Sequence, residues 1–128
     1  RRALYVAADV FQAPPDLRGL VAANENRARG AYRAVLNAGM QDQVIVTGVD
    51  APPDGIASIQ NGELGATTAF FQYALAYSSV EAAILILEGQ FDGKPEVVYG
   101  PQEIWSSENI SDKIEEYRDL YVGLQNMN

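Results

Sequence analysis

The chain has 128 residues, a length that fits one ordinary domain with a single core. Its hydrophobic share of 48% and charged share of 20% are typical of a globular protein and exclude a disordered or fibrous one. The net charge of −8 disfavours nucleic acid as a partner of this chain by itself, because that binding needs clustered Lys and Arg against phosphates. The absence of His and Cys excludes His-based or Cys-based nucleophilic catalysis, disulfides, and zinc sites with thiolate or imidazole ligands.

The first part of the chain predicts a helix, a strand and a second helix. Helical spacing of apolar residues predicts a helix over Arg2 to Gln12, and two prolines end it. The chain starts inside this helical pattern, so we expect it to be part of a longer protein. The apolar run from Leu20 to Ala22 predicts a buried strand. A helix follows from Asn24 to about Ala38, with Asn24 as its N-cap and Gly39 after its end.

Strands and helices alternate through the middle of the chain as well. Val44 to Val49 predicts a strand, and its continuous apolar character favours a sheet covered on both faces. A helix from Pro53 to about Gln60 and a strand from Gly65 to Phe70 follow. A longer helix is predicted from about Tyr73 to Glu88. We expect that helix to turn five apolar side chains inward: Leu75, Val80, Ala83, Ile84 and Leu87.

The last part of the chain predicts short strands and a final helix. Val97-Val98 and Gln102 to Trp105 are the expected strands, and Ser111 to about Leu124 is the expected charged, amphipathic helix. Alternation of helices and strands with short loops predicts an α/β fold with a mainly parallel sheet and helices on both faces.

Three strand ends carry side chains that could bind a ligand. Ligands of open α/β sheets bind outside the carboxyl ends of the strands, where the loops diverge and helix N-termini present free N–H groups. That rule selects Asn24, Asp50 and Phe70, the last followed by Phe71 and Gln72. An amide, a carboxylate and an aromatic surface together suit a sugar or polyol, because the polar groups bond hydroxyls and the aromatic ring covers the apolar C–H face.

Each of these residues also has a purely structural interpretation. Asn24 could be an N-cap and no more, and Asp50 could cap the following helix or hold its turn. Phe70 and Phe71 could belong to the core. Glycine-rich phosphate loops and the nucleophile elbow of hydrolases are absent from the sequence, so we expect no enzyme, and we expect no metal and no cofactor.

The order and spacing of several motifs resemble a known family. "GVDAPPDGIASIQNGELGATTAFFQYALAYSSVEAAILILEGQ", "PDLRGLVAANENRARGAYRAV" and "PQEIWSSENI" are similar to segments of the periplasmic sugar-binding proteins of ABC importers, of the ribose- and galactose-binding type. By this resemblance Asn24 and Asp50 fall on residues that bond sugar hydroxyls in ribose binders. Phe70 falls where such binders often have Gln, and this departure puts ribose itself in doubt.

The resemblance implies a two-lobe fold of which the chain holds a part. Residues 1–70 would belong to the second, C-terminal lobe, which would be incomplete at its start. Residues 71–99 would cross to the first lobe, and 100–128 would return as a strand and the last helix. The first, N-terminal lobe would be missing. The implied partners are a monosaccharide or related polyol and an ABC permease. The implied location is the periplasm or the cell exterior, with a lipoprotein anchor as a further form.

Two other interpretations share this fold. One is the effector-sensing domain of a lactose-repressor-type transcription regulator, which would carry a helix-turn-helix upstream. The other is a periplasmic partner of a membrane receptor, which differs only in the protein that reads the closed form. A signal peptide or lipoprotein signal upstream would favour transport over regulation.

Overall fold

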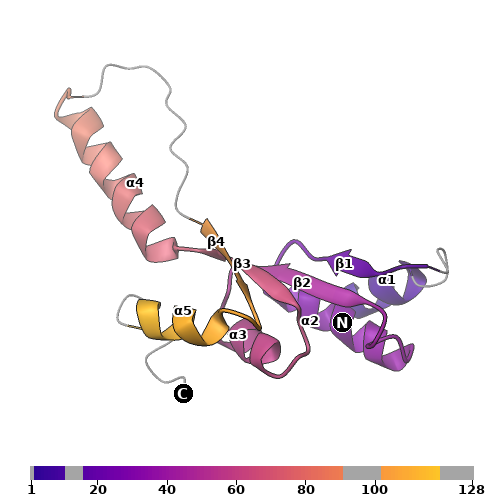
Figure 1. Ribbon diagram of the computed structural model, residues 1–128. Coiled ribbons are helices and arrows are strands. Elements are labelled where there is room, and N and C mark those ends of the chain that lie inside the picture. Colours follow the sequence, from indigo (N-terminus) through magenta and orange to yellow (C-terminus); the bar gives the residue numbers. More distant parts are fainter. Residues whose placement is uncertain (1, 11–15, 91–101, 119–128) are drawn as a thin grey trace.

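The computed structural model describes residues 2–10, 16–90 and 102–118. Within them the chain forms, in order, α1 (Arg2–Val10), β1 (Gly19–Val21), α2 (Glu25–Asn37), β2 (Ile45–Val49), α3 (Pro53–Gln60), β3 (Ala66–Phe70), α4 (Gln72–Leu87), β4 (Gln102–Ser106) and α5 (Ile110–Tyr117). Figure 1 shows these elements with the same labels.

The predicted order of helices and strands is confirmed in this part of the chain, with bounds that shift by one or two residues. Asn24 is the N-cap of α2, as predicted, and Gly39 follows the helix with a φ of +68°, a backbone conformation that glycine adopts without strain. The predicted strand at Val97-Val98 lies outside the described residues, as do the predicted ends of the first and last helices.

The sheet is mainly parallel, as the alternation of elements predicts. Its strand order is β1-β2-β3-β4. β2 runs parallel to both β1 and β3, whereas β4 runs antiparallel to β3. The carboxyl ends of β1, β2 and β3 therefore lie at one edge of the sheet, which we call the strand-end edge.

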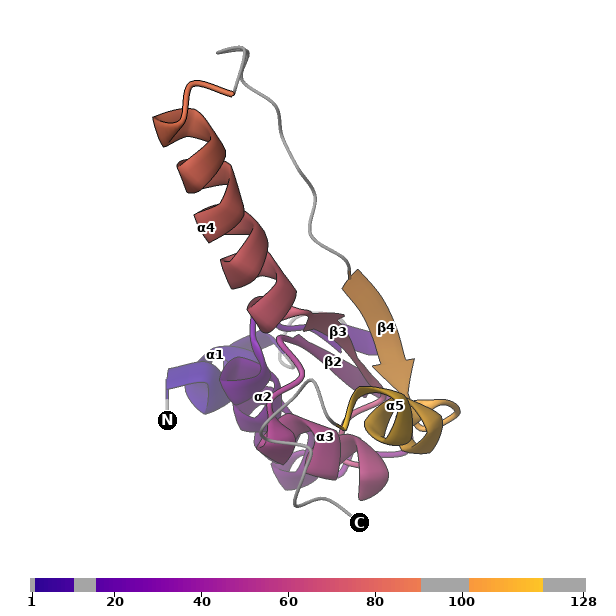
Figure 2. The same ribbon diagram turned by 90° about the vertical axis from the view of Figure 1, so that its left-hand side faces the viewer.

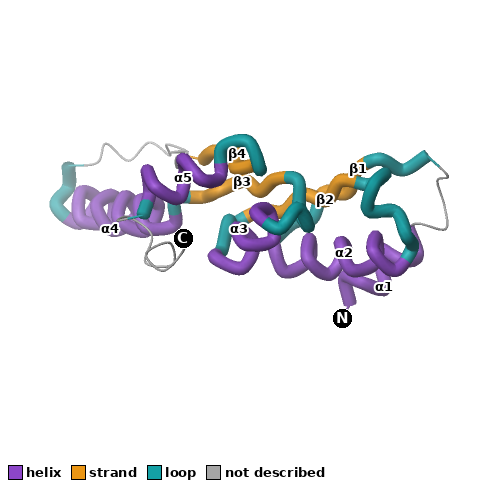
Figure 3. Tube along the Cα trace, turned by 60° about the horizontal axis from the view of Figure 1, so that its bottom comes forward, coloured by secondary structure: helices purple, strands orange, loops and turns teal. Residues whose placement is uncertain are grey.

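The described helices other than α4 pack on one face of this sheet (Figures 1 and 3). That face carries the core, in which Trp105 of β4, Val46 of β2 and Ala69 of β3 are at most 1% exposed. The buried apolar residues that complete it come mainly from α2, α3 and α5. These three helices contribute Ala28, Ala31, Ala34, Val35, Ile56, Ile59, Ile110 and Ile114.

The opposite face differs from the expectation of cover on both sides. Val21, Ile45 and Ile104 point to it and are 81%, 62% and 68% exposed. Apolar residues continue through β2 as they do in strands buried on both faces, but the described chain supplies helices for one face only.

Helix α4 is the second departure from the sequence prediction. It extends away from the rest of the molecule (Figures 1 and 2), and every residue from Leu75 to Gln90 is exposed. The predicted inward packing of Leu75, Val80, Ala83, Ile84 and Leu87 is therefore wrong for the described chain. Apolar side chains lie on all sides of α4, a pattern that indicates burial, but no other described element covers the helix.

Candidate ligand-binding site

The three predicted site residues lie on adjacent parallel strands at the strand-end edge. Asn24 follows β1, Asp50 directly follows β2, and Phe70 is the last residue of β3. The register pairs Val21 with Thr47 and Val49 with Thr68, so β2 ends two residues beyond β1, and β3 ends two residues beyond β2. The structure thus brings the three residues to one edge of the sheet.

Asn24 is an N-cap that keeps a donor group available. Its Oδ1 accepts a hydrogen bond of 3.0 Å from the backbone N–H of Arg27, which satisfies one of the free N–H groups of α2. Its side-chain N–H₂ group bonds no other residue in the described part of the chain. Capping and ligand binding are therefore compatible at Asn24, because they use different atoms of the amide.

Asp50 stands on a turn of unusual backbone conformation. Asp50 has a φ of +100° and Ala51 a φ of +49°, both in the region that residues other than glycine rarely adopt. Conformations of this kind cost on the order of 1–3 kcal/mol each and occur often at functional sites. The Asp50 N–H is held by the carbonyl of Thr68 at 2.9 Å, which extends the pairing of β2 with β3 by one residue.

The Asp50 carboxylate does not perform the structural task that its sequence position suggested. The N-cap of α3 is Pro52, with no side chain bonded to it. Among the described residues, no hydrogen bond or ion pair reaches the Asp50 carboxylate, which is half-buried. A half-buried carboxylate without a protein partner favours a ligand with hydroxyl groups as its partner.

The two neighbouring phenylalanines differ in their surroundings. Phe70 is half-buried at the end of β3, next to Gln102 of β4. Phe71 is 8% exposed and packs against Tyr117 of α5, with ring centroids 4.8 Å apart. The core interpretation is therefore confirmed for Phe71, whereas Phe70 remains at the strand-end edge.

A buried carboxyl group lies beneath the strand-end edge. Glu25, the first residue of α2, is 2% exposed, and its Oε2 accepts a hydrogen bond of 3.1 Å from the Thr67 hydroxyl. Within the described residues Oε1 has no hydrogen-bond partner. Burial raises the pKa of Glu25 to about 7, and the negative charges of Asp50 and Asp54 raise this pKa further, although the Thr67 hydroxyl opposes the shift.

Two glycines provide the space that Glu25 fills. A Cβ atom on Gly48 of β2 would overlap the Glu25 carboxyl group, and a Cβ atom on Gly55 of α3 would overlap the same side chain. Neither glycine has a positive φ. Glycine at these two positions is therefore explained by room for Glu25 rather than by backbone freedom.

The basic residues of α2 also have a place in the structure. The guanidinium of Arg29 pairs with the carboxylate of Asp54 and so links α2 to the first turn of α3. The Arg27 backbone completes the cap of Asn24. The sequence alone offered no role for these two arginines.

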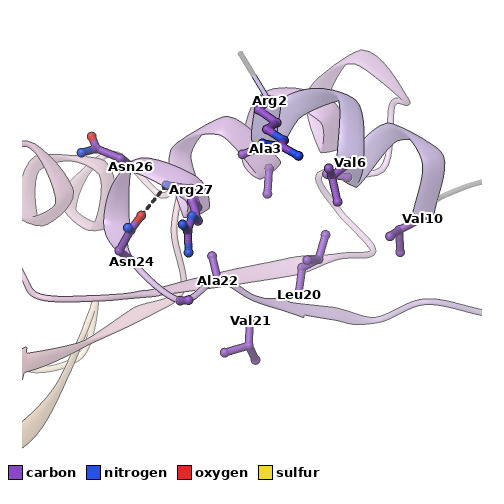
Figure 4. A pocket seen from close by; sticks show the side chains of 13 residues that line it. Arg2, Ala3, Val6, Val10, Leu20, Val21, Ala22, Asn24, Asn26 and Arg27 are labelled. Carbon is purple, nitrogen blue, oxygen red and sulfur yellow. Dashed lines mark hydrogen bonds between the residues drawn. The ribbon is translucent and has the colours of Figure 1, made fainter.

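A hollow of about 710 Å³ lies beside the predicted site, between α1 and β1 (Figure 4). Val6, Val10 and Leu20 line it, and Asn24 and Arg27 lie at one end of it. Asp50 and Phe70 are not among its lining residues. The hollow therefore follows the free edge of β1 and is separate from most of the predicted site.

Two further properties bear on function. In the described ranges, no group of three or more Asp and Glu side chains is arranged to hold a metal ion. No helix there has both the length and the apolar character that crossing a membrane requires.

Sequence reasoning missed Glu25 and Thr67 as residues of this edge. A signal for Glu25 was present, because it falls on the same face of α2 as the buried residues Ala28 and Ala31. A carboxylate on the apolar face of an amphipathic helix predicts a buried acid. Thr67 lacks a comparable signal, since Thr is common in strands.

A mainly parallel α/β sheet with an amide and a carboxylate beyond its strand ends is an arrangement that many small-molecule-binding domains share. Residues 2–91 match the family model described as a periplasmic binding protein domain, and the chain belongs to that family. It is similar to the ribose import binding protein of Escherichia coli (strain K12), with 36% identity over 89 residues. This match covers 70% of the chain but only 30% of that relative's length.

Solved structures show the same likeness. A periplasmic solute-binding protein from Actinobacillus succinogenes 130z with bound D-allose is 30% identical, with a TM-score of 0.76, over 87% of this chain and 38% of that one. A solute-binding protein from Bacillus halodurans C-125 with bound myo-inositol is 27% identical, with a TM-score of 0.72, over 93% of this chain and 39% of that one. The likeness supports the α/β fold predicted from the sequence.

Proposed function

We propose that this chain is part of a two-lobe solute-binding protein that captures a monosaccharide or related polyol and delivers it to an ABC importer. One observation carries the proposal. Asn24, Asp50 and Phe70 lie on three adjacent strand ends, and the Asp50 carboxylate has no partner among the described residues. The relatives bind ligands of the proposed class: one is a ribose import binding protein, and two solved structures hold D-allose and myo-inositol.

In this proposal each residue contacts a different part of the ligand. Asp50 accepts hydrogen bonds from hydroxyl groups, and Asn24 donates through the N–H₂ group that its cap leaves available. Phe70 lies against an apolar C–H face of the ring. The residues need no metal, no cofactor and no catalytic step for this task.

The exposed apolar surfaces support a division of the chain between two lobes. We assign residues 1–70 to the second lobe, 71–99 to the crossing into the first, and 100–128 to the returning strand and helix. Two observations support this assignment: α4 leaves the body with apolar side chains on all sides, and β4 then pairs with β3. The missing lobe would cover α4, and the ligand would be enclosed between the two lobes.

The protein is proposed to act in the periplasm or outside the cell, either free or held by a lipoprotein anchor. A transcription regulator of the lactose-repressor type has a related fold, but the relatives named above are import and solute-binding proteins, which favours transport. A helix-turn-helix upstream of residue 1 in the same reading frame would contradict the transport proposal.

Calorimetry tests the proposal directly. D-ribose, D-allose, myo-inositol and further pentoses and hexoses are titrated into the full-length protein that contains this chain. We expect saturable binding of at least one of them, and no heat from any of them would refute the sugar assignment. Residues 1–128 alone should bind none of them at millimolar concentrations, because one lobe leaves most of a small ligand in water.

A further inference from the structure

We infer that Glu25 and Thr67 are positioning residues, which hold the Asp50-Ala51 turn in its ligand-binding conformation through a buried chain of hydrogen bonds. The inference rests on the proposed function, in which Asp50 contacts the ligand. It concerns two residues that make no contact with ligand themselves, because both are buried on the helix-covered side of the sheet.

The chain of hydrogen bonds has a fixed direction. The backbone N–H of Ala51 donates to Thr67 Oγ1 at 3.3 Å, and the Thr67 hydroxyl donates to Glu25 Oε2 at 3.1 Å. A hydroxyl has one proton to donate, and here it goes to Glu25. The Thr67 oxygen is therefore left to accept the bond from Ala51. The order of donors runs from the turn, through β3, to α2.

The chain of hydrogen bonds links the segments after β1 and β2 to the second residue of β3. Glu25 directly follows Asn24 beyond β1, Ala51 directly follows Asp50 beyond β2, and Thr67 belongs to β3. A shift of any one member changes the bonds of the other two. The Asn24 cap and the Asp50 turn are thus coupled inside the protein before a ligand arrives.

The turn needs this support because of its backbone. Asp50 and Ala51 both have positive φ, which side chains with a Cβ atom rarely adopt. Such conformations persist where the surroundings impose them. Ala51 is 2% exposed, so water has little access to its N–H group, and Thr67 supplies the bond instead.

Gly48 and Gly55 support the inference independently of the polar groups. Any side chain at either position would displace the Glu25 carboxyl group, so both residues keep open the space it occupies. A carboxylate oxygen left without a partner is costly in a buried site. A role in holding the turn explains why a carboxyl group is placed there.

The first test needs no ligand. In the full-length protein, Thr67→Val keeps the shape of the side chain but removes the hydroxyl, and Thr67→Ser restores it. We expect Thr67→Val to speed hydrogen exchange of the Ala51 N–H by about tenfold or more, because its acceptor is lost. Thr67→Ser should exchange as the wild type does. Unchanged exchange in Thr67→Val would refute the inference.

Ser58→Ala is the matched control. Ser58 is 3% exposed, and its hydroxyl donates to Glu63 Oε2 at 2.8 Å, at the opposite edge of the sheet from Asp50. The variant therefore also removes one buried hydroxyl bond and should lower thermal stability to a similar degree. We expect neither Ala51 exchange nor ligand affinity to change in it.

The second test measures affinity for D-ribose, D-allose and myo-inositol. We expect Kd to rise about tenfold in Thr67→Val for whichever of them the wild type binds, with recovery in Thr67→Ser. A purely structural role would lower the melting temperature but leave Kd of the folded protein unchanged, and that result would overturn the inference. No binding by the wild type would instead refute the proposed function. Hydrogen exchange of the Ala51 N–H would still test whether the chain of hydrogen bonds holds the turn.

A glycine pair gives an independent check. Gly48→Ala displaces Glu25 without removing any polar group, whereas Gly19→Ala places a Cβ at an ordinary distance of 3.8 Å from the Ile45 carbonyl oxygen. Both positions lie in strands of the same sheet. We expect weaker binding and faster Ala51 exchange in Gly48→Ala alone. Equal behaviour of the two variants would contradict the role of Glu25.

Discussion

Two regions of the molecule each contain a carboxyl group with a shifted pKa, and the two pKa values shift in opposite directions. At the strand-end edge, Glu25 is buried beside Asp50 and Asp54, and its pKa is raised to about 7, chiefly by burial. At the contact between β4 and α5, Glu103 bonds Lys113 at 2.9 Å, the Tyr117 hydroxyl at 3.0 Å and Trp105 Nε1 at 3.3 Å. The bond to Lys113 is the main cause that lowers the pKa of Glu103.

The difference separates the proposed binding region from a region that stabilises the fold. In the β4–α5 contact the carboxylate has three partners, and the Trp105 and Tyr117 rings stack with centroids 5.8 Å apart. At the strand-end edge, the Asp50 carboxylate and one oxygen of Glu25 lack partners among the described residues. Unused bonding capacity is a cost to folding, and it is useful where a ligand arrives later.

The largest expected effect is on stability, in the β4–α5 contact. Trp105→Ala should lower the free energy of unfolding by about 3–5 kcal/mol, because Trp105 is fully buried and its removal leaves a cavity. Denaturant unfolding of the full-length protein measures this loss. Affinity for sugar should stay near the wild-type value at a temperature where the variant is folded. A loss of affinity with little loss of stability would reverse the roles assigned to the two regions.

The next effect is the pH dependence of stability at the strand-end edge. The pKa of Glu25 is raised from 4.5 to about 7 in the folded protein, so its favourable contribution is full below pH 4.5 and is lost as pH rises through 7. The loss is on the order of 3 kcal/mol. The side chain of the Glu25→Gln variant is neutral and does not titrate. The stability of the wild type relative to Glu25→Gln should therefore fall between pH 5 and pH 8. A constant difference would show that the pKa of Glu25 is not raised.

Asp50 should give a smaller effect, and on binding rather than stability. Asp50→Ala in the full-length protein should weaken sugar binding by about 2 kcal/mol, because a charge-assisted hydrogen bond is lost and a sugar hydroxyl is left unpaired. The melting temperature should change little, since the Asp50 carboxylate bonds no described residue. Asp50→Asn is the control, because Asn tolerates a positive φ and keeps one acceptor oxygen. Full affinity in both variants would exclude Asp50 from the site.

The smallest effect expected here comes from one hydrogen bond of the β4–α5 contact. Tyr117→Phe removes the hydroxyl that donates to Glu103 and should cost about 1 kcal/mol of stability. Ligand affinity should not change. Thermal unfolding and calorimetry on the same samples measure both quantities. A change of Kd in this variant would contradict the assignment of the β4–α5 contact to stability alone.

Much of the fold could be predicted from the sequence because its signals are local. Asn24 before α2, Gly39 after it and the prolines before α3 mark helix ends within a residue or two. The strand-end rule placed Asn24, Asp50 and Phe70 at one edge for the same reason, since it needs only the order of strands and helices.

The features that could not be predicted depend on distant parts of the chain. Apolar residues in α4 indicate burial but do not say against which element, and the described chain contains no element that covers them. The hydrogen-bond chain joins Glu25 to Thr67 across 42 positions, and no spacing rule connects two such residues. The positive φ of Asp50 and Ala51 was equally hidden, because sequences signal such turns mainly through glycine.

The antiparallel pairing of β4 with β3 also sets an order of events during synthesis. β3 ends at Phe70, and its neighbour begins at Gln102, after α4 and the segment that follows it. Trp105, Ile110 and Ile114 of the core therefore leave the ribosome after β1, β2 and β3. Pairing two strands that are so far apart in the sequence is slow and carries an entropy cost. Until it closes, β3 has an open side, so the nascent chain is exposed to aggregation for the time needed to translate residues 71–114.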